Sequence, residues 1–432
     1  MTQIYVETQA TSVEDESYPG RPTAKQRLRK ALVRTSRGLL GGAVYAAVSV
    51  WGGALKLGRS GKQYPPLRSE TFHPRRILVI RLDLIGDLVL SMVIVRVLKR
   101  TYPDAEIDLI SVPASAKVIE GDPDVARLLG YDPNIWRRPR ALLQKQNWRE
   151  LRALVKTLHG REYDLAISVF GKWAGVLAAL SGAQRRLGFG RESFPGLMTD
   201  SVAGKHWTPG EKKHEVDYCL ELAQAAGAAI EPEDRYPYLY VPEKTTQEIE
   251  QILTTAGVQP GRQIITCHVS ANNGQSKRWP VPYWATLLDR LIREEEAAVI
   301  LTGAPGDLPL IEKITRRMHE QPINLAGKTS LVQLAALFKR ADLLISGDSG
   351  PMHMAGAVGT SLIVIHGPTD PALSGPVSHF ATILRSDIWC SPCYQARDTA
   401  DCRFFTTQCM KDVLPAQVFV LAQEKVRERS HA

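Results

Sequence analysis

Three short groups of polar residues in this chain combine residue types that can move a proton and bind a phosphate. Asp87 follows an apolar run and opens a stretch with helical periodicity. Lys277 and Arg278 lie in a polar stretch after another apolar run, and Asp348-Ser349-Gly350 follows a third. A carboxylate can accept the proton of an attacking hydroxyl, and cations can bind a diphosphate. These groups are therefore the first candidates for a site.

Asp87 is a candidate general base because it stands where a predicted first strand passes into a helix. In an open α/β sheet this position borders the crevice that binds ligands. The alternative is structural: Asp87 or Asp83 would serve only as an N-cap or as an acid in the first helical turn. The sequence leaves both interpretations open.

The stretch from Ser270 to Pro280 contains the candidate cations Lys277 and Arg278, which could meet a diphosphate. Taken alone, the stretch favours a solvated loop in which Trp279 and Pro280 pack at the start of a helix. Ser270, Lys277 and Arg278 are predicted donor-binding residues only in combination with the group that follows.

The segment after residue 346 has the features of a phosphate cradle. Gly350 permits close approach of the backbone, Ser349 offers a hydroxyl, and a following helix would present free N–H groups. Asp348, Pro351 and His353 adjoin these residues. A second polar turn, residues 366–371, is predicted at the same end of the sheet, although ordinary turn chemistry explains each turn separately.

The elements that must position these residues alternate between strands and helices. Apolar, β-branched runs predict strands, and helices fit between them. The runs are residues 76–82, 106–112, 164–169, 263–269, 297–303, 341–346 and 361–366. This order predicts an α/β fold whose parallel sheets bind ligands at the carboxyl ends of their strands.

The positive charge of the chain is concentrated at its N-terminus. Residues 1–76 hold thirteen Lys/Arg and five Asp/Glu, a balance of +8 out of the net +9. The remainder is nearly neutral, which argues against a nucleic-acid-binding protein. With no secretory signal pattern near the N-terminus, we expect the body to be cytoplasmic.

The N-terminal extension, residues 1–75, is expected to contain a disordered tail, a membrane-associating helix and a linker. Residues 1–22 are polar without periodicity, and residues 23–37 are basic and amphipathic. Residues 39–55 carry no charge, but they are short for a spanning helix and are flanked by cations on both sides. We therefore expect residues 23–58 to lie on an anionic membrane surface; the alternative is a helix packed on the protein's own surface.

Four of the six cysteines cluster near the C-terminus, at Cys390, Cys393, Cys402 and Cys409. Their spacing is compatible with a structural zinc, although the second pair is not a Cys-x2-Cys knuckle. Disulfides and free or packing thiols are the alternatives.

Taken in order, these motifs resemble glycosyltransferase family 9, the ADP-heptose–lipopolysaccharide heptosyltransferase group. The resemblance runs from about Arg76 to about Val420 and rests on ILVIRLDLIGDLVLS, YPDAEIDLI, PDV, SKRWP, ISGDSGPMHMAGAVG, HGPTDP, CSPC and QCM. It implies the GT-B architecture, two Rossmann-like domains facing across a cleft. We place these domains at residues 76–242, which would bind the acceptor, and 243–414, which would bind the nucleotide sugar. Residues 415–432 would form a helix that returns to the first domain.

The resemblance also implies an inverting, metal-independent transfer that requires no cofactor. Asp87 would be the base, Lys277 would stabilise the diphosphate leaving group, and Asp348 would help to hold the donor. Ser349, Gly350 and Pro351 would line the donor phosphates, and His353 would orient this loop. The chain departs from the family pattern at Leu90, where histidine is common, and at Ser349 and Pro351, which replace a common Thr and Leu. The first departure bears on the acceptor more than on the reaction.

The function expected from the sequence is transfer of a heptose-like sugar from a nucleotide diphosphate, such as ADP, to a lipid-linked glycan such as lipopolysaccharide core. The enzyme would be peripheral or monotopic at the inner face of the cell membrane. The alternative of another class is a non-catalytic nucleotide-sugar-binding scaffold at the membrane. An oxidoreductase is excluded, because residues 83–87 lack the three-glycine fingerprint of dinucleotide-binding folds.

Overall fold

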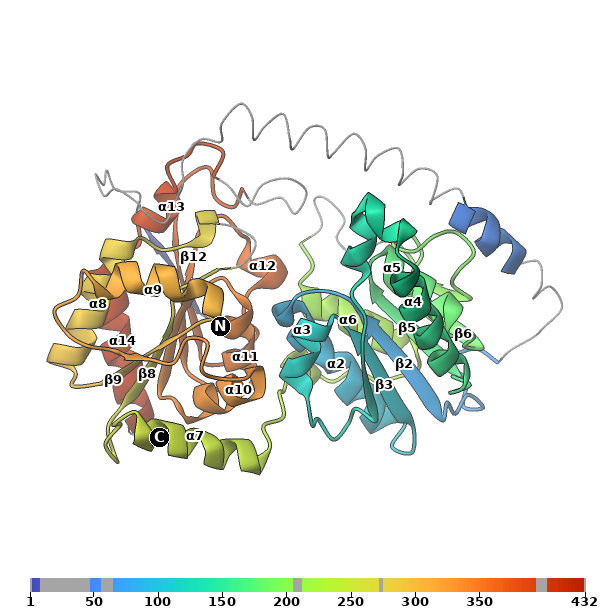
Figure 1. The fold of residues 1–432 in the computed structure, drawn as a ribbon, viewed down its shortest axis with the longest axis horizontal. Coiled ribbons are helices and arrows are strands. Elements are labelled where there is room, and N and C mark those ends of the chain that lie inside the picture. Colours follow the sequence, from blue (N-terminus) through green and yellow to red (C-terminus); the bar gives the residue numbers. More distant parts are fainter. Residues whose placement is uncertain are drawn as a thin grey trace. The chain divides into compact units, whose positions relative to one another are not determined.

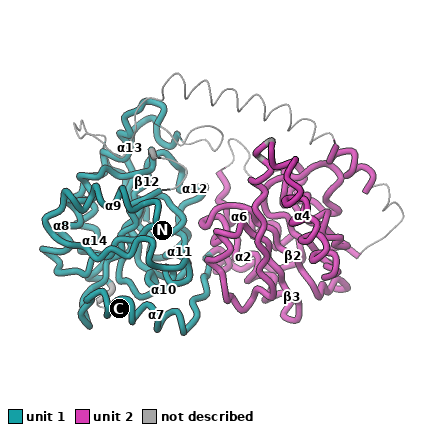
Figure 2. The backbone as a smooth tube through the Cα atoms, in the orientation of Figure 1, with its two compact units in different colours: residues 1–21, 236–432 teal, residues 22–235 magenta. Residues whose placement is uncertain are grey.

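The chain forms two compact units (Figure 2). A computed structural model describes residues 2–7, 47–55, 65–204, 212–271, 275–393 and 402–430. Unit 2 comprises residues 22–235, and unit 1 comprises residues 1–21 together with 236–432. The boundary therefore falls after Arg235 rather than after Pro242, and the N-terminal residues belong with the C-terminal unit.

Unit 2 is built on a six-stranded parallel sheet with the order β4-β3-β2-β5-β6-β7. The strands are β2 (Arg76–Arg81), β3 (Glu106–Ser111), β4 (Arg127–Gly130), β5 (Leu165–Phe170), β6 (Arg185–Phe189) and β7 (Asp200–Val202). Residues 77–80 of β2 are completely buried, as expected of a strand covered on both faces. The strands predicted at residues 76, 106 and 164 are confirmed.

Helices cover both faces of this sheet (Figure 1). On one side α2 (Ile85–Thr101) packs against α6 (Glu215–Ala225), and on the other α4 (Lys145–His159) packs against α5 (Lys172–Leu180). The shorter helices are α3 (Pro113–Ala116), η1 (Lys117–Ile119), η2 (Pro133–Arg137), η3 (Pro139–Leu143) and η4 (Pro232–Arg235).

Unit 1 contains a seven-stranded parallel sheet with the order β1-β13-β12-β11-β8-β9-β10. The strands are β1 (Thr2–Val6), β8 (Ile264–His268), β9 (Ala298–Thr302), β10 (Ile323–Asn324), β11 (Leu343–Gly347), β12 (Leu362–His366) and β13 (Ala381–Ser386). The four predicted strands of this half are confirmed as β8, β9, β11 and β12. Both sheets thus have the α/β architecture expected from the sequence.

The helices of unit 1 also form two layers around the sheet. They are α7 (Glu243–Thr255), η5 (Gln275–Lys277), α8 (Val281–Glu294), η6 (Pro305–Asp307), α9 (Leu308–Thr315), α10 (Leu331–Arg340), α11 (Gly350–Ala357), α12 (Pro371–Ser374), α13 (Gln408–Lys411) and α14 (Pro415–Ser430). The predicted final helix is present as α14, but it packs on α8 of its own unit. Its residues Val418, Phe419 and Ala422 belong to the core of unit 1.

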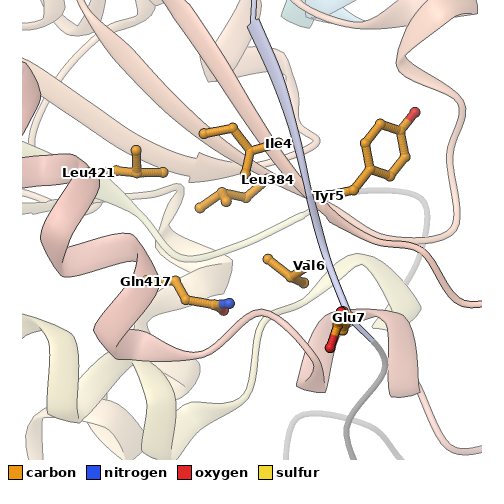
Figure 3. Close-up of a pocket in the computed structure, with 7 residues that line it drawn as sticks. All are labelled: Ile4, Tyr5, Val6, Glu7, Leu384, Gln417 and Leu421. Carbon is orange, nitrogen blue, oxygen red and sulfur yellow. The ribbon is translucent and has the colours of Figure 1, made fainter.

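The prediction of a disordered tail is wrong for residues 2–6, which form β1. This strand pairs in parallel with β13, from Thr2 opposite Thr382 to Val6 opposite Ser386. Ile4 lies with Leu384 and Leu421, whereas Tyr5 points away from them (Figure 3). The alternation of buried and exposed side chains is that of a strand that covers the edge of a sheet.

Part of the N-terminal apolar segment is a helix, residues 47–55, that packs on unit 2. Val48, Trp51 and Leu55 contact the cluster formed by α5 and residues 193–198. A Cβ on Gly52 would lie 2.1 Å from the carbonyl oxygen of Pro195, so the two backbones touch. This part follows the alternative of packing on the protein's own surface. The basic stretch 23–37 and the linker up to residue 64 lie outside the described residues.

Candidate active site

In unit 1 the polar loops converge because the parallel strands deliver their carboxyl ends to one edge of the sheet. Strand β8 lies between β11 and β9, and β12 is the next strand beyond β11. The loops after β8, β11 and β12 therefore open side by side at the position where doubly wound sheets bind ligands.

Lys277 and Asp348 meet at this edge. The Lys277 Nζ lies 2.7 Å from the Asp348 Oδ2, and the two side chains are only 12% and 9% exposed. Burial opposes ionisation of Asp348, but Lys277 and His366 outweigh it and lower its pKa to about 2. The site therefore holds a fixed carboxylate beside a nearly buried ammonium group, which is a preorganised electrostatic element.

Two anchors hold Lys277 in place. Trp279 is buried and donates its indole N–H to the Val413 carbonyl oxygen at 2.8 Å, while its ring packs edge-on against Trp284. On the other side, a Cβ on Gly347 would lie 3.3 Å from the Lys277 carbonyl oxygen, so η5 rests on the end of β11. The packing of Trp279 and Pro280 at the start of a helix, which was the structural alternative in the sequence analysis, is therefore present. The same packing holds Lys277 in place.

The turn after β12 adds a hydroxyl and an imidazole that the sequence did not single out. The Thr369 hydroxyl lies 3.2 Å from the His366 Nδ1, and a hydrogen bond from Thr369 helps to keep the Asp348 pKa low. Both side chains are buried. The polar turn was recognised in the sequence, but the contact with Asp348 depends on the adjacency of β11 and β12, which no local pattern reports.

The remaining predicted donor-binding residues are distributed over the same edge. Ser349 is the N-cap of α11 and its hydroxyl lies 3.1 Å from that of Ser346, while Gly350 and Pro351 form the first turn and His353 is buried one turn later. Ser270 instead donates its hydroxyl hydrogen to Asp307 at 2.5 Å. Arg278 is half-buried beside Lys277 in sequence. Asn272, Asn273 and Gly274 lie outside the described residues.

Two buried histidines at this edge predict that the protein loses stability in mild acid. Burial lowers the pKa of His268 and of His366 to about 4 each, against opposing effects of Asp307 and Asp348. An unfolded histidine titrates near 6.5, so between these values the unfolded chain binds a proton that the folded chain does not. The contribution of each neutral histidine to the free energy of unfolding is therefore fully present above pH 6.5. It is lost as the pH falls toward 4, by up to about 3 kcal/mol per histidine.

Urea unfolding at a series of pH values measures this loss. The His268→Gln variant should show a shallower decline between pH 6.5 and pH 4 than the parent protein. Equal slopes in the two proteins would contradict the assignment of this acid sensitivity to the buried imidazole.

In unit 2 the candidate base Asp87 lies in the first turn of α2, directly after β2. Helix α2 has Leu84 as its N-cap without a side-chain capping bond, so the N-cap alternative for Asp83 and Asp87 is wrong. Asp87 is nevertheless the first-turn acid of this helix, with its side chain 37% exposed. It remains a candidate base with access to solvent. Leu90, the departure from the family pattern, is buried in the core.

A buried arginine holds the carboxylates of this turn. The Arg81 guanidinium lies 2.7 Å from Glu215, 3.1 Å from Asp83 and 3.5 Å from Asp87, and its side chain is only 2% exposed. Burial lowers the Arg81 pKa, but the three carboxylates raise it more, so Arg81 stays charged. The sequence did not reveal this network, because Glu215 is 134 residues away along the chain.

The four clustered cysteines are free thiols in the structure. Within the described ranges, which include all four, no group of three or more His, Cys, Asp or Glu side chains could hold a metal ion. The structural-zinc interpretation for Cys390, Cys393, Cys402 and Cys409 therefore finds no support. The segment instead braces the turn after β12, since the Cys393 N–H donates to the Pro368 carbonyl oxygen at 2.9 Å.

Solved structures share this two-sheet fold. A glycosyl transferase family 9 protein from Veillonella parvula aligns with a TM-score of 0.67 and 21% identity, covering 82% of this chain and 97% of that one. The Escherichia coli ADP-heptose LPS heptosyltransferase II aligns with a TM-score of 0.66 and 24% identity, covering 82% and 99%. The fold is therefore GT-B, the two-domain architecture of a large class of glycosyltransferases.

Sequence comparison names the family. Residues 151–403 match glycosyltransferase family 9 (heptosyltransferase). Lipooligosaccharide heptosyltransferase 2 of Haemophilus influenzae is 30% identical over 72% of this chain and 88% of its own length, and lipopolysaccharide heptosyltransferase 2 of Escherichia coli K12 is 29% identical over the same shares. This chain belongs to glycosyltransferase family 9 and is a glycosyltransferase. Membership in a family of enzymes sets aside the non-catalytic scaffold.

Proposed function

We propose that this enzyme transfers a heptose-like sugar from a nucleotide diphosphate donor to a lipid-linked glycan such as lipopolysaccharide core. The observation that carries the proposal is the Lys277–Asp348 pair at the carboxyl edge of the unit 1 sheet. Its relatives are heptosyltransferases by name, and one E. coli structural relative was solved with ADP. ADP-heptose is accordingly the first donor to test.

The proposed reaction is a single displacement that inverts the anomeric carbon. The acceptor hydroxyl oxygen attacks that carbon while Asp87 takes the hydroxyl proton, and the bond between the carbon and the diphosphate oxygen breaks. Lys277 neutralises charge on the departing diphosphate, and Asp348 keeps Lys277 aimed at it. In this scheme the leaving group is stabilised by the protein's own cation, so a divalent metal is not required.

Donor binding and transfer can be tested separately on the purified protein. We expect an ADP-sugar, and not GDP- or UDP-sugars, to raise the melting temperature, since a ligand that binds only the folded state stabilises it. Transfer to lipopolysaccharide core should persist in excess EDTA. A folded protein that responds to none of the three nucleotide-sugar classes would contradict the donor assignment, and inhibition by EDTA would contradict the metal-independent mechanism.

We also propose that the enzyme works peripherally at the inner face of the cell membrane, where a lipid-linked acceptor is accessible. The basic composition of residues 23–37 supports this location. No helix in the described ranges is long and apolar enough to cross a bilayer.

A further inference from the structure

Helix α4 of unit 2 carries four cations in a row. Lys145, Arg149, Arg152 and Lys156 follow one another at intervals of four, three and four residues, so they lie on one face of the helix. All four are exposed, and none forms an ion pair with any residue that the structure describes. Like charges at this spacing destabilise a helix, and a bound anionic partner would relieve that repulsion.

The opposite face of α4 explains why the cations point outward. Leu151 and Leu154 pack on the core of unit 2, and Leu158 is completely buried within it. The helix therefore packs its apolar side on the core of unit 2, next to α5 (Figure 1). Residues 136–156 contain seven Lys/Arg and a single Glu, so this stretch of the sequence is strongly basic.

Apolar side chains project at the N-terminal end of this row. Leu143 is 84% exposed and Leu142 is 39% exposed at the end of η3, and Trp148 is 43% exposed at the edge of the cationic stripe. Trp148 packs on Trp136 with a ring separation of 4.8 Å, and its indole N–H donates to the Leu142 carbonyl oxygen at 2.9 Å. The projecting tip is thus fixed by aromatic packing.

The helix of residues 47–55 and Trp173 pack on one hydrophobic cluster. Trp173 stacks with Trp136 at 6.2 Å, and it also packs in the cluster that contains Trp51. On this helix Val50 is 75% exposed.

We propose that this α4 face, defined as Leu142, Leu143, Lys145, Trp148, Arg149, Arg152 and Lys156, docks on an anionic lipid bilayer. Exposed cations would meet the lipid phosphates while the two leucines and the edge of Trp148 enter the interfacial region. A soluble anionic glycan would bind through the cations alone and would leave Leu142 and Leu143 exposed to water, whereas a bilayer would also bury them. The inference adds a second contact, on the folded body, to the membrane location proposed above, and it does not depend on the donor or on Asp87.

Vesicle sedimentation of the full-length protein tests the proposal. The probe vesicles contain about one part phosphatidylglycerol to two parts phosphatidylcholine, and pure phosphatidylcholine vesicles serve for comparison. Each cation near an anionic surface strengthens binding roughly fivefold, so Arg149→Glu/Arg152→Glu should weaken binding at least about 30-fold. Leu142→Ser/Leu143→Ser should also weaken binding, with less effect on its salt dependence.

A matched control is Lys313→Glu/Lys339→Glu, which changes the net charge equally through exposed cations on α9 and α10 of unit 1. It should bind vesicles like the parent protein. The proposal is overturned if Arg149→Glu/Arg152→Glu binds as tightly as this control, or if the leucine variant binds like the parent protein. In either case ADP-sugar binding by all variants remains a separate measure of the proposed function.

Discussion

Replacing Lys277 with Met should both destabilise the protein and nearly abolish transfer. The substitution leaves the Asp348 carboxylate, 9% exposed, without the ammonium group that lies 2.7 Å away. An unpaired buried charge of this kind costs about 3–5 kcal/mol of folding free energy. If Lys277 also stabilises the leaving diphosphate, we expect kcat/KM to fall by about 10²–10³-fold.

The two effects separate in the double variant Lys277→Met/Asp348→Asn. Removing the second charge eliminates the uncompensated carboxylate, so urea unfolding should show that most of the lost stability returns. Transfer activity should stay low because the cation is still missing. Recovery of activity together with stability would reduce Lys277 to a structural role and remove it from the catalytic scheme.

The fold could be predicted from the sequence where burial leaves a local pattern. Residues 77–80 are apolar without interruption because β2 is covered on both faces, and residues 343–345 of β11 and 362–365 of β12 show the same pattern. In the sequence of β1, only Ile4, Tyr5 and Val6 suggest a strand, and the residues around them are polar. Its partner β13 is more than 370 residues away along the chain, and no local pattern reports such a pairing.

The candidate site was predictable to the extent that it depends on strand ends. Asp348 and Lys277 each follow a recognisable strand, and β8 and β11 pair directly, so their loops meet. The Thr369 contact and the Arg81–Glu215 pair were not predictable, because each depends on which elements become neighbours in space. The four cysteines are a different case: their spacing is compatible with a metal site, and no such group of ligands is found among the described residues.

The proposed base predicts a different kind of loss, one in rate without a comparable loss in donor binding. In Asp87→Asn the amide has nearly the shape of the carboxylate but cannot accept the proton of the acceptor hydroxyl. General base catalysis contributes typically about 10²–10⁴-fold, and we expect kcat to fall by that factor while ADP-sugar binding is retained. Single-turnover transfer and thermal shift with the donor measure the two quantities.

Asp83→Asn is the matched control, because the same turn and the same arginine hold both carboxylates. Arg81 lies 3.1 Å from Asp83 and 3.5 Å from Asp87, and in either variant it keeps Glu215 at 2.7 Å. Both substitutions therefore disturb the buried charge to a similar extent, but only Asp87→Asn removes the proposed base. Equal losses of rate in the two variants would mean that the carboxylates act only by supporting Arg81, and the proton acceptor would have to be sought elsewhere.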